Sequence, residues 1–182
     1  MQEGYVPCAL RALVVAGVLL QLALFTVPVS AQPLVHDDGQ LQQQPNSCAL
    51  AALSYALNFS YAANTSEQQL AELAADYYAG SKSAPPPLGY SIADVQRLSA
   101  RLGVNASVWQ LPLSQIHRVS LPALFWLAEA GQSHVVVLTQ LARGSVRVFD
   151  PAVGHRWLGS SLFADRWLAG GQRGIAIELA VN

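Results

Sequence analysis

The repeat of hydrophobic and polar positions changes character at Gly103. Before that residue, apolar side chains recur at three- and four-residue spacings, which is the repeat of an amphipathic helix. A Thr-x-x-Gln capping box at Thr65 and a similar Ser-x-x-Asp signal at Ser91 mark two helix starts. The pattern therefore predicts three helices, over residues 48–58, 65–78 and 92–102.

After Gly103 the apolar segments become short and rich in β-branched and aromatic residues, with Gly, Pro or Asn between them. Such segments are typical of strands. Five strands are predicted, over residues 104–110, 123–127, 133–141, 145–149 and 175–181, with short helices in the connections at 113–117 and 160–167. Helices followed by strands predict an α+β domain, in which N-terminal helices pack on a C-terminal antiparallel sheet.

The first 31 residues have the layout of an export signal. Arg11 precedes an apolar run over residues 12–27, and Val29-Ser30-Ala31 supplies the small residues that a signal peptidase requires. We expect cleavage after Ala31, which leaves residues 32–182 as one domain of common size. The alternative is an uncleaved segment that anchors the chain. Three prolines within residues 81–89 predict a surface loop in that domain.

Charge and residue spacing exclude several classes of partner. The chain has 10 Lys and Arg against 11 Asp and Glu, scattered without runs. This balance favours neither nucleic acid nor an anionic membrane surface. Membrane contact is expected only through the signal segment, if that segment is uncleaved. The Cys and His spacings fit no zinc pattern, so we expect neither a metal nor another cofactor.

One cysteine, Cys48, remains once the signal segment and its Cys8 are removed. In an exported protein a leftover thiol indicates an intermolecular bond, a reactive group or a buried structural residue. Pro45-Asn46-Ser47 leads into the first predicted helix, so Ser47 is expected to be its N-cap and Cys48 to lie in the first turn. The positive end of the helix dipole favours a thiolate there. Alternatively, Cys48 packs as a small hydrophobe.

A histidine near the thiol would favour the reactive form, because a Cys–His pair can exist as thiolate and imidazolium. His36, His117 and His155 lie in polar, helix-end or turn settings. His134 differs, because it stands where the chain enters a buried strand, directly before Val135-Val136-Val137. His134 is therefore the candidate base, and an ordinary histidine at a strand edge is the alternative.

A catalytic imidazole also needs an acceptor that orients it. Asp150 ends the segment SVRVFDP. A three-residue turn over residues 142–144 would place Asp150 opposite Val136 and on the same face as His134. A two-residue turn at Arg143-Gly144 would place the two side chains on opposite faces. Without such a partner, Asp150 is an ordinary Asp-Pro turn starter.

A further requirement is a donor for the oxyanion that forms when a thiolate attacks a carbonyl group. Gln42 lies six residues before Cys48, which is enough chain for its amide to fold back beside the sulfur. The backbone N–H of Cys48 would be the second donor. Gln40, Gln43 and Gln44 crowd the same stretch and are alternatives.

Three segments resemble the sequence boxes of the C39 cysteine peptidases: QQQPNSCALAAL, GQSHVVVL and VFDPAVGH. The segment GYSIADVQRLSARLGVNA resembles the region between the cysteine and histidine boxes, so the resemblance runs from about residue 34 to 180. It implies a papain-like α+β fold. It also implies Cys48 as nucleophile, His134 as general base and acid, Asp150 as its orienter and Gln42 as oxyanion donor. Ala49 stands where the family usually has glycine.

The resemblance also implies a function. Family members cleave peptides after a double glycine, so the expected partner is a peptide or protein substrate that bears a leader. The layout is similar to exported relatives that accompany functional-amyloid secretion systems, which implies a periplasmic location and a secreted amyloid substrate. Two other hypotheses remain: an inactive module that binds glycine-rich peptides, and transfer chemistry in which an amine resolves the thioester.

Overall fold

Three helices precede the sheet: α1 (Cys48–Tyr61), α2 (Glu67–Gly80) and α3 (Ile92–Arg101). They belong to a computed structural model that describes residues 40–81, 89–129 and 131–181. The predicted box at Ser91 is present, since the Ser91 and Asp94 side chains each accept a backbone N–H of the other residue. The box of α2 is one residue later than predicted, because its cap is Ser66. Thr65 instead pairs with Asn58 of α1.

Six strands then form one antiparallel sheet in the order β1-β6-β2-β3-β4-β5. Their bounds are β1 Val104–Leu111, β2 Ala123–Glu129, β3 Gln132–Ala142, β4 Ser145–Asp150, β5 Gly154–Gly159 and β6 Gly174–Val181. A 3-10 helix, η1 (Leu113–Arg118), and a helix, α4 (Ser160–Leu168), lie in connections where short helices are predicted. The α+β class predicted from the sequence is confirmed.

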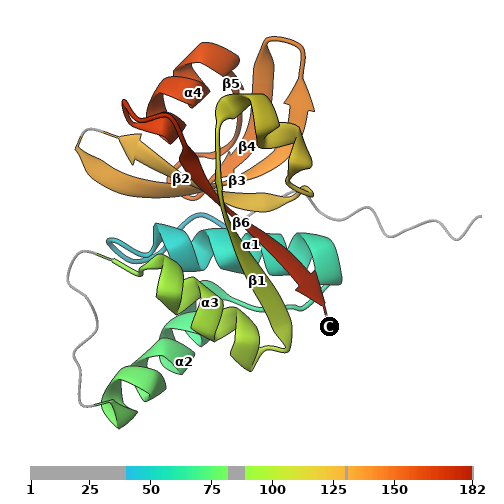
Figure 1. Cartoon of the computed structure of the whole chain (residues 1–182). Coiled ribbons are helices and arrows are strands. Elements are labelled where there is room, and N and C mark those ends of the chain that lie inside the picture. Colours follow the sequence, from blue (N-terminus) through green and yellow to red (C-terminus); the bar gives the residue numbers. More distant parts are fainter. Residues whose placement is uncertain (1–39, 82–88, 130, 182) are drawn as a thin grey trace, which may run out of the picture. The chain divides into compact units, whose positions relative to one another are not determined.

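The sheet lies between two layers of helix, with α1, α2 and α3 on one side and α4 on the other (Figure 1). Successive residues of β3 divide between the two layers: Val135 and Val137 join the core under α1, while Val136 joins the core under α4. Each fully buried side chain of this kind contributes about 1.5–3 kcal/mol. Burial on both faces explains why this strand is a continuous apolar run in the sequence.

The strand β5 (Gly154–Gly159) was not predicted, because it is short and glycine-flanked and only His155 was assigned, to a turn. The strand pairs with β4, from Ser145 opposite Gly159 to Asp150 opposite Gly154. His155, expected in a turn, therefore lies in a strand, where its ring packs against Tyr55 and Phe149. This correction matters for the site, since β5 adds a neighbour to the strand that ends at Asp150.

Two predictions concern residues that the structure does not describe. The signal segment, residues 1–31, lies wholly outside the described residues, and the proline-rich loop at 81–89 lies mostly outside them. Among the described residues, no helix combines the length and apolar character that crossing a membrane requires.

Candidate active site

Cys48 is the first residue of α1, and its side chain is partly exposed. The preceding turn places Asn46 in the left-handed region, with φ of 61°. Ser47 is the N-cap residue, as predicted, but its side chain forms no capping bond, because its hydroxyl donates to the Gln44 carbonyl oxygen at 2.6 Å. The hydroxyl thus ties the approach loop together, and the cysteine lies at a helix N-terminus without a side-chain cap, where the dipole favours negative charge.

His134 and Asp150 are in direct contact. The Nε2 atom of His134 lies 2.8 Å from Oδ1 of Asp150. The thiol of Cys48 also forms a hydrogen bond with the His134 side chain. With Nε2 held by Asp150, Nδ1 is the ring nitrogen left for the sulfur. Sulfur, imidazole and carboxylate therefore lie in series, although they come from α1, β3 and β4.

The β3–β4 hairpin places Asp150 beside His134 through a turn and a β-bulge that differ from the predicted three-residue turn. Ala142 pairs with Ser145, so the turn has two residues rather than three. That turn alone would put Asp150 on the wrong face. A β-bulge between Leu138 and Gln140 adds one residue to β3 and restores the predicted register, with Val137 opposite Phe149. Asp150 is thereby brought to the face of His134.

Asp150 is 1% exposed, and both of its carboxylate oxygens have partners. The Oδ1 atom accepts the N–H of Ala152 at 2.9 Å in addition to the His134 contact, and Oδ2 forms an ion pair with Nη2 of Arg156. Burial by itself raises the pKa of this carboxyl, but the bonds from His134 and Ala152 and the charges of His134 and Arg156 lower it below its ordinary value. Asp150 is therefore ionised across the working pH range.

The same contacts favour the charged form of His134, whose side chain is 14% exposed. Burial of the ring opposes the positive charge, but the hydrogen bonds and charges of Asp150 and Cys48 raise the pKa of His134 to about 9. A cysteine beside an imidazolium is the usual arrangement of an activated sulfur nucleophile. The arrangement thus provides both a nucleophile and a proton donor.

The loop that carries Gln42 is fixed at both ends. The Gln42 N–H donates to the Pro151 carbonyl oxygen at 2.8 Å, next to Asp150. The carboxylate of Glu67, which is 3% exposed at the start of α2, accepts the N–H groups of Gln43 and Gln44 at 2.8 and 3.2 Å. The side chain of Gln42 donates to the Gln44 carbonyl oxygen over a long 3.4 Å. Such a weak bond is easily exchanged for a bond to another acceptor.

A cavity of about 490 Å³ connects these groups. Gln42, Cys48 and His134 line it, as do Gly89, Tyr90 and Trp126. This volume is in the usual range for ligand sites and is enough for a few peptide residues. The three predicted residues therefore face one common space.

A comparison with protein families matches residues 38–171 to the model of the Peptidase C39 family. The chain belongs to the Peptidase C39 family. The resemblance drawn from the cysteine, histidine and aspartate segments is thereby confirmed. The match includes Gln42, Cys48, His134 and Asp150.

This C39 protein is similar to the probable functional amyloid protease FapD of Pseudomonas aeruginosa strain PAO1. The two are 28% identical over 130 residues, which cover 69% of this chain and 55% of FapD. The C39 protein thus spans about half the length of that curated relative.

Solved peptidase domains have the same papain-like fold. The peptidase domain of Streptococcus ComA, a bifunctional transporter in quorum sensing, superposes with a TM-score of 0.64 at 20% identity, over 79% of this chain and 97% of that one. A double glycine motif protease from an AMS/PCAT transporter, in complex with the leader peptide, gives 0.61 at 17% identity, over 78% and 89%. These likenesses confirm the predicted papain-like α+β architecture.

Three residues near the site escaped prediction: Glu67, Glu129 and Arg156. A carboxylate oxygen of Glu129, a ring nitrogen of His134 and a carboxylate oxygen of Asp150 lie within 4.8 Å of one another. The positions of these residues in the sequence do not reveal this cluster. Glu129 forms an ion pair with Arg166 of α4, as Asp150 does with Arg156. Protein partners therefore already engage both carboxylates of this cluster.

Proposed function

We propose that this C39 protein is a cysteine peptidase that hydrolyses peptide bonds after glycine-glycine in an exported substrate. The observation that carries the proposal is the series of Cys48, His134 and Asp150, in which Cys48 and His134 line one cavity and Asp150 lies buried behind His134. A module that only binds peptides has no chemical need for these three groups in contact.

In the proposed reaction the sulfur of Cys48 attacks the carbonyl carbon of the scissile bond. The resulting oxyanion accepts hydrogen bonds from the Cys48 N–H and the Gln42 amide, which gives up its long bond to Gln44. His134 donates its proton to the departing amine as the C–N bond breaks, leaving a thioester on Cys48. His134, now neutral, takes a proton from water as the water oxygen attacks the thioester carbonyl carbon. The C–S bond then breaks, which releases the carboxylic acid and restores the thiolate beside the imidazolium.

Likeness to relatives supports the proposed substrate class. FapD is described as a probable functional amyloid protease, and one structural neighbour as a double glycine motif protease with a leader peptide. We propose by analogy a secreted amyloid or leader-bearing protein as the substrate, and the periplasm as the place of action. The signal-like pattern over residues 1–31 supports that location.

To test this function, the purified protein is incubated with exported proteins from the same genome that contain a glycine-glycine sequence. We expect a cut after the second glycine, detected by mass spectrometry, and its loss in Cys48→Ala and in substrates with Ala-Ala at that position. Equal binding by the wild type and Cys48→Ala without any product would instead favour the binding module. Products that carry an added amine, such as glycinamide, in place of a carboxylic acid would favour transfer chemistry.

A second measurement tests the location. We expect expressed protein recovered from a Gram-negative periplasm to begin at Gln32. A membrane-bound product that retains residues 1–31 would favour the anchor, and a cytoplasmic product would contradict export.

A further inference from the structure

The carboxylate of Asp150 has two oxygen atoms with different partners. One oxygen faces His134 and also accepts the N–H of Ala152, at 2.9 Å. The other faces the guanidinium of Arg156. A carboxylate turns easily about the last torsion of its side chain. The partner of the second oxygen therefore helps to fix the orientation of the first oxygen toward His134.

Arg156 comes from β5, directly opposite Val148 of β4. Asp150 is two residues after Val148, so Arg156 and Asp150 are diagonal neighbours on one face of the sheet. The Arg156 side chain is only partly exposed, at 31%, against the 2% of the Asp150 side chain. The ion pair is thus built by strand register and lies largely out of water, where such bonds are strong.

We propose that Arg156 is a positioning residue of the peptidase, which holds the Asp150 carboxylate in the orientation that keeps His134 beside Cys48. Arg156 contacts the carboxylate and acts through it. The inference rests on the proposed function and extends the site from three residues to four.

The charged groups around His134 come from five elements. They are Cys48 of α1, Asp150 of β4, Glu129 of β2 with its partner Arg166 of α4, and, behind Asp150, Arg156 of β5. Removal of a positive charge from this group would by itself favour the imidazolium. Loss of orientation at Asp150 disfavours it. The two effects of removing Arg156 on the protonation of His134 therefore have opposite signs, and only the loss of orientation lowers the His134 pKa.

The experiment measures the rate at which iodoacetamide alkylates Cys48 in the full chain as a function of pH. Because the thiolate is the reacting form, Arg156→Ala is expected to lower the rate at about pH 6 by roughly tenfold, toward that of an ordinary thiol. Arg156→Lys, which keeps a cation in reach of Oδ2, is expected to recover much of the rate. On peptide substrates the loss in Arg156→Ala should fall on kcat with little change in KM.

A double-mutant cycle tests whether Arg156 acts through Asp150. If it does, Arg156→Ala has no further effect on the alkylation profile once Asp150→Asn is present. Additive effects would overturn the proposal, as would an Arg156→Ala profile equal to the wild type. Enhanced alkylation near pH 6 would also overturn it, because loss of the Asp150 orientation can only lower that rate.

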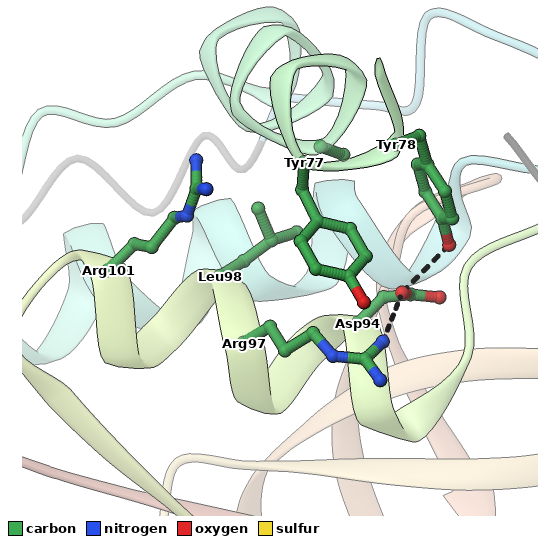
Figure 2. Close-up of a pocket in the computed structure, with 7 residues that line it drawn as sticks. Tyr77, Tyr78, Asp94, Arg97, Leu98 and Arg101 are labelled. Carbon is green, nitrogen blue, oxygen red and sulfur yellow. Dashed lines mark hydrogen bonds and ion pairs between the residues drawn. The ribbon is translucent and has the colours of Figure 1, made fainter. Parts of the chain in front are cut away.

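Arg97 provides the matched control. It pairs with the buried Asp94 of the same helix, α3, at 3.2 Å, beside Tyr77 and Tyr78 of α2 in a pocket that none of the candidate catalytic residues lines (Figure 2). Arg97→Ala thus also removes an arginine from a buried aspartate, but should leave the alkylation profile unchanged. If both variants lose alkylation in proportion to their loss of stability, the role of Arg156 is merely structural. Alkylation of Cys48 does not require peptide cleavage. If the alkylation profile depends on Arg156 but the protein cleaves no peptide, the proposed peptidase function is contradicted, whereas the positioning role of Arg156 is not.

Discussion

Gly89 lies so close to Asn46 that a Cβ atom on it would come within 2.7 Å of the Asn46 carbonyl oxygen. The φ of Gly89 is +98°, a value that other residues rarely adopt. Both residues line the cavity, and Asn46 is two residues before Cys48. The chain beyond the proline-rich segment therefore packs directly against the approach to the candidate nucleophile.

Gly89→Ala is accordingly expected to displace the Asn46 main chain and to lower both Cys48 alkylation and peptide cleavage. Gly103→Ala is the control, because Gly103 also has a positive φ of 75° but has no atom within 4 Å of the added Cβ. Both variants should lose about 1–2 kcal/mol of stability from backbone strain. Equal activity in the two variants, measured at matched folded fractions, would contradict a role for the close approach.

Glu67→Gln is expected to loosen the loop that carries Gln42. The carboxylate of Glu67 accepts two backbone N–H groups, and an amide would turn its own NH₂ toward one of them. Loss of one such part-buried hydrogen bond to a charged group costs about 1 kcal/mol or more, which urea unfolding would detect. Turnover should fall as well. Glu72→Gln, at an exposed position on the same helix, should change neither quantity.

Gln42→Ala is expected to lower kcat by roughly 10²–10³-fold, the usual cost of losing one oxyanion donor. Cys48 alkylation at low pH should stay the same, because no oxyanion forms in that reaction. Gln43→Ala is the control, since its exposed side chain is adjacent in the chain while its main chain provides the bond to Glu67. A parallel loss of alkylation in Gln42→Ala would indicate that Gln42 supports the loop rather than the oxyanion.

The predictable parts of this fold are those that short stretches of sequence encode. The helices, five strands and the box at Ser91 follow from local periodicity and capping. The β3–β4 register was predicted for the wrong reason, because a bulge at Thr139 offsets a turn that is one residue shorter than expected. The Thr139 hydroxyl bonds to the Arg147 carbonyl oxygen there, and local sequence patterns do not mark this cross-strand contact.

The supporting residues of the site were less predictable than its reactive groups. Cys48 and His134 were singled out because their residue types are reactive and stand at element boundaries. Glu67 and Arg156 are ordinary charged residues in sequence, and only the tertiary fold brings them to the Gln42 loop and to Asp150. Recognition of β5 as a strand would have placed Arg156 diagonal to Asp150.

The pH dependence of stability follows from the charged state of His134. Its pKa is about 9 in the folded chain, against an ordinary value of 6.5, so the folded state holds this proton more firmly than the unfolded state. The resulting contribution is fully present below about pH 6.5 and is lost as the pH rises through about 9, with a magnitude of about 3 kcal/mol. Asp150 acts in the opposite sense, since its lowered pKa gives stability that is lost as the pH falls through its folded value.

We therefore expect the free energy of unfolding in urea to decrease between about pH 6.5 and 9. In His134→Gln the alkaline decrease should largely disappear, because the glutamine amide does not titrate. In Asp150→Asn it should shrink, because the main partner that favours the imidazolium has lost its charge. A His134→Gln profile parallel to that of the wild type would show that the decrease arises elsewhere. It would then remove the imidazolium, and with it the proton donor, from the proposed mechanism.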